Sequence, residues 1–240
     1  MIHLLRGTAI CGALLAAFPA GAQQFAGGQA DVTYRGYNDS DVDALSARVS
    51  GELALSRGFS LQGDLFTGNV GDDFDDIGSV GATLHTLFHI SETSSVGAFV
   101  TYEELEGASF GSVGVEAGAT FGTFATEVWL GVGEDEFGSD GNYFGLETRR
   151  GMGPVNLFAS LEYYNVSGDL ESVQSGIGVE YEGLNGIGLS AAVEQVHVEQ
   201  DTFFGASSDS TTSLSLGATY RFGKRPGTVF GERSITGIFR

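Results

Sequence analysis

Apolar and polar residues alternate along most of this chain, and Ser213–Phe222 shows the pattern most clearly. One set of alternate positions holds Leu214, Leu216, Ala218, Tyr220 and Phe222, and the other holds Ser213, Ser215, Gly217, Thr219 and Arg221. In an extended strand these two sets point to opposite faces, so one face suits hydrocarbon and the other suits water. A strand of about ten residues with this pattern can cross a membrane obliquely, provided that it belongs to a closed barrel.

Twelve segments of the chain follow the same rule, with apolar residues at every second position. They are Gln29–Tyr37, Ala44–Leu55, Phe59–Thr67, Gly78–Ile90, Ser95–Glu103, Gly111–Phe121, Thr123–Gly133, Asn142–Arg150, Val155–Asn165, Val173–Glu182, Gly186–Val198 and Thr212–Phe222. The sequence therefore predicts an all-β fold, a closed antiparallel transmembrane β-barrel of about 12 strands with up-and-down topology.

The links between these segments alternate in length. Short links follow the even segments, and long, often acidic links follow the odd ones, namely Asn38–Asp43, Gly68–Asp76, Glu104–Phe110, Glu134–Gly141, Val166–Ser172 and Glu199–Thr211. Outer-membrane barrels have short turns in the periplasm, long loops outside and an even number of strands. We therefore expect both ends of the barrel to lie in the periplasm.

The two ends of the chain differ from the barrel pattern. Residues 1–22 have Arg6, an apolar core and an Ala20-Gly21-Ala22 cleavage site, which together predict a secretory signal peptide. Residues 23–222 then form the outer-membrane β-barrel. Residues 223–240 are expected to be a C-terminal periplasmic tail or a short extra strand. The tail is favoured, because a thirteenth strand would place the two termini on opposite sides.

Composition narrows the class of protein further. The chain has 11 Lys and Arg against 31 Asp and Glu, for a formal net charge of −20, so a nucleic-acid partner is not expected. Beyond Ala22 no apolar run approaches the roughly 18 residues of a membrane helix. Its one cysteine, Cys11, lies in the predicted signal peptide, so no disulfide is expected in the mature chain.

The inward face of the predicted barrel is the candidate functional surface. By the alternation, the pore-lining candidates are Arg48, Glu52, Asp64, Glu116, Glu127, Glu147, Arg149, Glu162, Glu180, Glu194 and Arg221. Acids outnumber bases among them, and carboxylates at a constriction favour cations. Glu116 and Glu127 flank the tight turn at Gly122, so we expect them to face each other and to repel unless cations screen them. In the alternative arrangement, the acids pair with arginines across a filled lumen.

Other features of the sequence offer weaker hypotheses. The acidic links at residues 72–76 and 134–136 could collect divalent cations, but they lack the spacing and glycine of a calcium loop, so a solvated, repulsive surface is the favoured interpretation. Aromatic residues near the predicted strand ends, such as Phe88, Tyr102 and Tyr143, fit two girdles at the membrane interfaces.

An enzyme hypothesis depends on very few residues. Outer-membrane phospholipases use a His-x-Ser pair, and His89-Ile90-Ser91 has that spacing. No orienting Asn or Asp can be assigned to it, however. His85 and His89 share one face, but two histidines without a third ligand make a weak metal site. We therefore expect no catalytic residues, no cofactor and no metal.

Two stretches resemble a known family. Gly178–Val193, in which two strands meet at a Gly/Asn turn, and the closing Gly217–Phe222 are similar to the hairpins and last strand of Gram-negative general porins. That resemblance implies a channel for passive diffusion of small hydrophilic solutes or ions, although those porins usually have about sixteen strands. Expected partners are outer-membrane lipid and lipopolysaccharide and small hydrophilic solutes or cations. The alternatives are a non-conducting structural or surface-interaction barrel and an outer-membrane hydrolase.

Overall fold

A computed structural model describes residues 24–38, 42–71, 76–166, 170–202, 205–224 and 228–234. Its strands are β1 (Gln24–Tyr37), β2 (Asp43–Ala54), β3 (Phe59–Gly71), β4 (Asp76–Ser91), β5 (Ser94–Leu105), β6 (Ala108–Phe121), β7 (Phe124–Asp135), β8 (Asp140–Met152), β9 (Val155–Val166), β10 (Leu170–Glu182), β11 (Ile187–Thr202) and β12 (Gly205–Gly223), with a 3-10 turn, η1 (Leu184–Gly186), before β11. The predicted signal peptide, residues 1–22, lies outside the described residues and stays a prediction.

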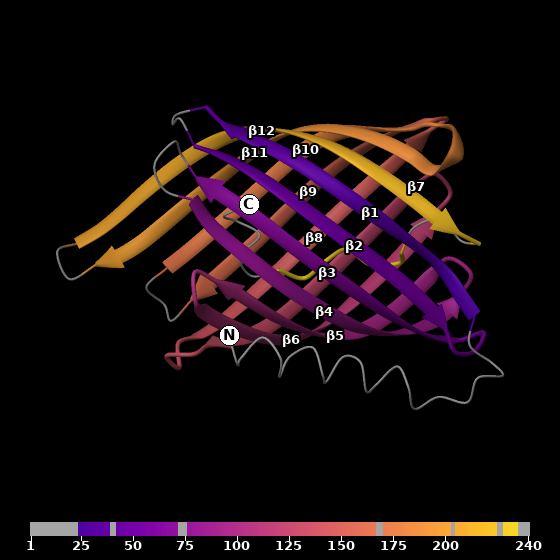
Figure 1. The fold of residues 1–240 in the computed structure, drawn as a ribbon, viewed down its shortest axis with the longest axis horizontal. Helices are drawn as coiled ribbons and strands as arrows, with labels where there is room; N and C mark the ends of the chain where they lie inside the picture. The colour runs from indigo at the N-terminus through magenta and orange to yellow at the C-terminus, as the bar shows by residue number, and fades with distance from the viewer. Residues whose placement is uncertain are drawn as a thin grey trace.

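Each strand pairs antiparallel with its neighbours in the chain, and β1 pairs with β12 to close the barrel (Figure 1). The closing seam aligns Ala30 with Tyr220 and Val32 with Ala218, so the apolar faces of the first and last strands match. Closure pairs the outer edges of β1 and β12 with each other. A strand in hydrocarbon requires this pairing, because no water is present there to satisfy unpaired backbone groups. The predicted closed, antiparallel, up-and-down barrel of twelve strands is confirmed.

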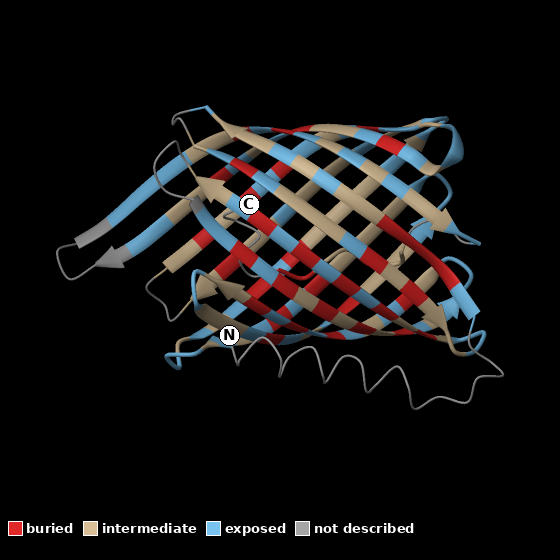
Figure 2. Ribbon diagram, viewed as in Figure 1, coloured by how far each residue is buried: buried red, intermediate tan, exposed pale blue. Residues whose placement is uncertain are grey.

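The barrel is apolar outside and polar inside. Leu45 is 54% exposed on the outer wall, whereas Glu52 and Gln62 are 0% exposed on the inner wall. Exposed and buried residues alternate along the strands in Figure 2, as the period of two predicts. No helix in the described ranges is long and apolar enough to cross a membrane. Exposed apolar residues on almost every strand make the outer wall a surface for lipid.

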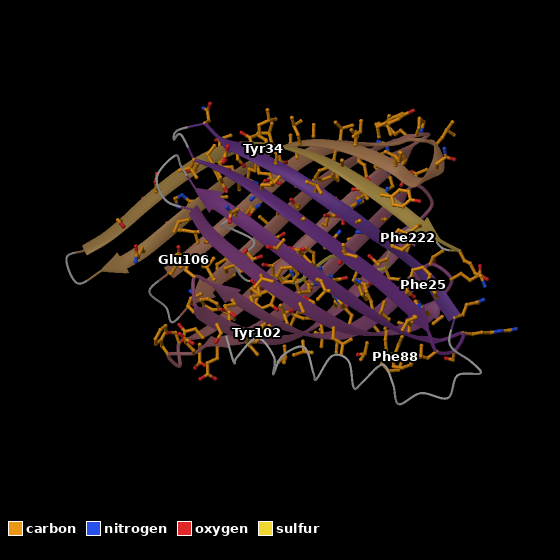
Figure 3. All side chains as sticks on the ribbon, viewed as in Figure 1. Phe25, Tyr34, Phe88, Tyr102, Glu106 and Phe222 are labelled. Atoms are coloured by element: carbon orange, nitrogen blue, oxygen red, sulfur yellow. The ribbon has the colours of Figure 1, made fainter. Side chains whose placement is uncertain are left out.

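Outward aromatic residues gather toward both ends of the barrel. Tyr34 and Tyr102 lie toward one end, and Phe88 and Phe222 toward the other (Figure 3). Tyr102 and Phe88 are 55% and 54% exposed, which fits the expected interfacial girdles. The expectation for Tyr143 was wrong, because its side chain is 4% exposed and belongs to a buried aromatic cluster.

Several links are shorter than the sequence predicted, because the strands continue into them. The clearest correction is Glu104–Phe110, where β5 runs to Leu105 and β6 begins at Ala108. Only Glu106 and Gly107 remain as the turn, with φ of 49° and 88°. Two successive positive φ angles are typical of the tight hairpin turn that matches strand twist.

The link between β11 and β12 was also predicted to be long. Instead, β11 continues to Thr202 and β12 begins at Gly205, which forms a hairpin that projects beyond the neighbouring strands (Figure 1). We call this end of the barrel the hairpin end. The opposite end carries the turns after β2, β4, β6, β8 and β10, together with Gln24 and Gly223, and we call it the short-turn end.

Large inward aromatic side chains lie directly opposite glycines of the adjacent strand. Trp129 on β7 pairs with Gly145 on β8, and Phe99 on β5 pairs with Gly114 on β6. A Cβ added to Gly145 would lie 2.1 Å from two ring atoms of Trp129. The glycine therefore lets the ring lie flat across the neighbouring strand instead of projecting into the lumen.

The C-terminal segment Thr228–Ser234 lies inside the barrel. Phe230 and Arg233 are each 2% exposed and contact inward residues of the strands. In Figure 1 it is the yellow coil within the ring of strands. For residues 228–234 this corrects the expected periplasmic tail or extra strand. The physical reason is that the lumen offers Arg233 carboxylate partners that the periplasm does not.

Candidate functional site

A cavity of about 840 Å³ lies in the lumen beside the C-terminal segment. Its lining extends from Gly122 and Gly151 at the short-turn end to Arg35 and Ser46, which lie near the hairpin ends of β1 and β2. The acidic residues of the lining are Asp31, Glu127, Glu147, Glu162, Glu180, Glu182, Glu194 and Glu232, and the basic ones are Arg35, Arg48, Arg149, Arg221 and Arg233. Acids therefore outnumber bases along this path.

The structure places the predicted pore-lining residues in two groups, all on the inner wall. Eight border the cavity, namely Arg48, Glu127, Glu147, Arg149, Glu162, Glu180, Glu194 and Arg221. The other three, Glu52, Asp64 and Glu116, are 0%, 1% and 3% exposed. Those three are covered by neighbouring lumen side chains, so they do not border the path directly.

Arginines along the cavity wall pair with carboxylates of neighbouring strands. Arg48 Nη2 lies 2.8 Å from Asp31 Oδ2, and Arg35 Nη2 lies 2.6 Å from Glu194 Oε2. Near the short-turn end, Glu180 pairs with both Arg149 and Arg221. The alternative of paired acids and arginines thus describes these positions well. The excess of acids over bases nevertheless remains in the lining.

The opposite side of the lumen contains a buried chain of acids and bases. His85 Nε2 lies 2.9 Å from Asp64 Oδ2, and its Nδ1 lies 2.8 Å from Glu116 Oε1, with all three side chains fully buried. Strands β3, β4 and β6 supply these groups, so the hydrogen bonds run across the inner wall from β3 to β6, with β5 between β4 and β6. Buried polar groups satisfied in this way fix their side chains in position.

Arg233 extends this chain to the C-terminal segment. Its Nε donates to Glu116 Oε2 at 2.9 Å, and its Nη2 donates to Glu127 Oε1. The guanidinium also lies over the ring of Trp129, 4.2 Å from its centroid, in a cation-π contact. We refer to Asp64, His85, Glu116, Arg233 and Glu127 as the acid-base chain.

The expected opposition of Glu116 and Glu127 needs two corrections. Glu116 pairs across the strands with Trp129, and Glu127 pairs with Gly118, so the two carboxylates are diagonal neighbours. They are also bridged by Arg233 instead of facing each other across open water. The cation that the sequence argument required between them is a side chain of the same protein.

Phe230 and Ser234 attach the same segment to other strands. The side-chain amide of Gln62 donates to the Phe230 carbonyl at 2.8 Å and accepts from the Phe230 N–H at 3.2 Å. Ser234 donates to Glu103 Oε2 at 3.0 Å, while Tyr164 donates to the Ser234 carbonyl at 3.2 Å. The segment is therefore held by β3 at one point and by β5 and β9 at another.

The geometry around His89 differs from the proposed His-x-Ser pair. His89 contacts the hydroxyls of Ser60 and Ser95 at 2.9 and 2.8 Å, whereas the Ser91 hydroxyl contacts Thr93. His85 is engaged by two carboxylates and shares no metal site with His89. Among the described residues, no group of three or more His, Cys, Asp or Glu is placed to hold a metal ion.

Sequence reasoning missed Arg233, Phe230 and Gln62 as lumen residues. Gln62 falls on the inward face by alternation, but its uncharged amide gives no electrostatic signal that distinguishes it from other inward polar residues. The two C-terminal residues lie after the last predicted strand, where alternation makes no statement. One available signal was the adjacent pair Glu232 and Arg233, the two charged residues of the stretch 229–239.

Comparisons with known proteins agree with this architecture. The sequence model of a family described as Gram-negative porin matches residues 67–230. A search of curated protein sequences finds no match.

Among solved structures, a KdgM porin in complex with disordered oligogalacturonate is similar at a TM-score of 0.62 and 10% identity, covering 81% of this chain and 99% of that one. The NanC porin is similar at 0.62 and 9%, covering 80% and 100%. The COG4313 outer membrane channel of Pseudomonas putida F1 is similar at 0.55 and 11%, covering 85% and 100%. At these identities the likeness shows the fold.

Proposed function

Because the chain belongs to the Gram-negative porin family, we propose that it forms a cation-preferring channel for passive diffusion of small hydrophilic solutes or ions. The observation that carries this proposal is the cavity of about 840 Å³, which lies in the lumen and is lined by more acids than bases. Fixed negative charges beside a narrow aqueous path raise the local concentration of cations and lower that of anions.

The charge of the lumen also limits the class of solute. A similar porin was solved with oligogalacturonate, an anionic oligosaccharide. In the present lumen each cavity-lining arginine already has a carboxylate partner, including Arg35 with Glu194 and Arg48 with Asp31. Arginines engaged in this way are poor anchors for a polyanion, which supports small neutral or cationic solutes instead.

The placement in the membrane follows from the two ends of the barrel and from its apolar outer wall. We propose export through a cleaved signal peptide at residues 1–22, with the short-turn end in the periplasm and the β11–β12 hairpin outside. Exposed apolar side chains such as Leu45 and Leu216 would contact outer-membrane lipid, and the hairpin end would contact lipopolysaccharide.

A planar-bilayer recording tests this proposal. The purified protein should give discrete conductance steps. In a KCl gradient, the reversal potential should shift from zero toward the Nernst potential of K⁺. Replacement of Glu180 by Gln should reduce this cation preference, because it leaves Arg149 and Arg221 with one carboxylate fewer between them. Glu92→Gln is the matched control, since Glu92 lies exposed in the turn between β4 and β5.

A non-conducting structural or surface-interaction barrel is the second candidate. It is favoured by Thr228–Ser234, which occupies part of the lumen. Complete absence of conductance in the same recording would select this candidate over the channel. Equal reversal potentials for Glu180→Gln and Glu92→Gln would show that Glu180, at the short-turn end of the barrel, does not set ion selectivity.

A further inference from the structure

The C-terminal segment Thr228–Ser234 borders the proposed path directly. All seven of its residues contribute to the lining of the cavity, together with inward residues of β1, β2 and β7. The space available for diffusion is therefore bounded on one side by the chain's own C-terminal segment. Any change in the position of this segment alters the width of the path.

Contacts with several strands fix the segment in place. Gln62 on β3 bonds both the N–H and the carbonyl of Phe230, as a neighbouring strand would. Gly118 on β6 faces the ring, since a Cβ there would lie 3.1 Å from Phe230 Cε1. Phe230 is therefore held by two hydrogen bonds to its backbone, and its ring fits against a position of the wall that has no side chain.

Arg233 provides the electrostatic attachment. It bonds Glu116 and Glu127, its side chain is 1% exposed, and it lies 4.2 Å from the centroid of the Trp129 ring. A buried guanidinium is stable only when carboxylates and further hydrogen bonds surround it. The fit also works in the other direction, because the two carboxylates are diagonal neighbours that would repel each other without the cation.

We propose that Thr228–Ser234 is a built-in constriction of the channel and that Arg233 is its selectivity-determining residue. This inference rests on the proposed channel function. Glu116, Glu127 and Arg233 together carry a formal charge of −1 at the constriction. Because Arg233 masks part of the negative charge of the lumen, its removal makes the path both wider and more negative.

Charge substitutions test the selectivity of the constriction in opposite directions. Arg233→Gln changes the formal charge of this group from −1 to −2, and Glu116→Gln with Glu127→Gln changes it to +1. In a KCl gradient we expect Arg233→Gln to increase cation preference and conductance, and the double variant to decrease cation preference. Arg57→Gln is the matched control, because Arg57 is exposed in the turn between β2 and β3.

Trp129 gives a second readout that needs no conductance. It is the single tryptophan of the chain, and Arg233 covers its ring. Arg233→Gln should increase quenching of its fluorescence by acrylamide, whereas Arg57→Gln should not. Arg233→Lys guards against a folding failure of the neutral variant. The lysine keeps the positive charge but lacks the planar fork and stacking surface, so quenching should rise while ion selectivity stays near that of the wild type.

The outcomes separate this inference from the channel proposal. If the wild type conducts, but Arg233→Gln matches Arg57→Gln in both reversal potential and quenching, the channel stands and the constriction is wrong. If neither the wild type nor any variant conducts, the channel proposal is wrong, and the proposed constriction is wrong with it. A silent wild type with a conducting Arg233→Gln variant would contradict both the open channel and the constriction, because the segment would then close the lumen instead of narrowing it.

Discussion

Replacement of Gly145 by Ala tests the close packing of inward aromatics on glycines. Gly145 pairs with Trp129 across β7 and β8. The new Cβ would lie 2.1 Å from Trp129 Cε2 and Cζ2 and 2.6 Å from Nε1. The ring cannot move simply into the lumen, because the guanidinium of Arg233 lies over it with its carbon 4.2 Å from the ring centroid.

Two opposing terms set the change in the free energy of unfolding that Gly145→Ala causes. Alanine in place of glycine restricts the unfolded chain and stabilises a strand by about 0.4–1 kcal/mol when it fits. Overpacking of a tightly filled site costs about 1–3 kcal/mol. The matched control is Gly63→Ala on β3, where a Cβ meets nothing within 4 Å and only the first term applies. We therefore expect Gly145→Ala to be about 1–3 kcal/mol less stable than Gly63→Ala.

Urea unfolding in detergent micelles, followed by fluorescence of Trp129, measures this difference. The two variants are compared by their free energies of unfolding, provided that these fall with urea concentration at the same slope. Gly145→Ala should also increase acrylamide quenching before unfolding, because a displaced ring disturbs its contact with Arg233. Equal free energies of unfolding for the two variants would refute the argument that Gly145 is required by close approach of the ring.

Two further predictions concern topology and the C-terminal segment. A protease site inserted between Thr202 and Gly205 should be cleaved on intact cells, whereas one inserted between Gly153 and Pro154 should be protected; reversed cleavage would show that the barrel is oriented the other way. Gln62→Leu should increase acrylamide quenching of Trp129, because it removes both hydrogen bonds to the Phe230 backbone, while Gln195→Leu should not; unchanged quenching would mean that Gln62 does not hold the segment.

Much of the barrel wall could be predicted from the sequence, because the period of two is a local property of each strand. Alternation in Ser213–Phe222 placed Leu214 outside and Ser215 inside, and the structure has them 54% and 7% exposed. The same reasoning placed Glu52, Asp64 and Glu116 on the inner wall without knowledge of any neighbour. In a membrane barrel the two sides of a strand meet opposite solvents, so one strand's pattern already specifies its orientation.

Turn lengths and cross-strand geometry depended on the register between strands. The sequence could not show that β5 and β6 continue to a two-residue turn at Glu106 and Gly107, because acidic and small residues suit both a loop and a strand end. Register also decided that Glu116 lies opposite Trp129 rather than opposite Glu127. Tyr143 differs from these cases, because it shares a face of β8 with Glu147 and Arg149, so alternation alone already assigned it to the lumen and the girdle expectation overlooked this.

Only the tertiary structure decided where the C-terminal segment lies. Gln62 and Phe230 are 168 positions apart in the chain, and Glu116 and Arg233 are 117 apart. No local pattern connects such residues, since the partners become neighbours only when closure of the barrel brings β3, β6 and β7 around one lumen. Alternation determines which side chains enter the lumen, whereas the three-dimensional arrangement of those side chains determines what else the lumen can hold.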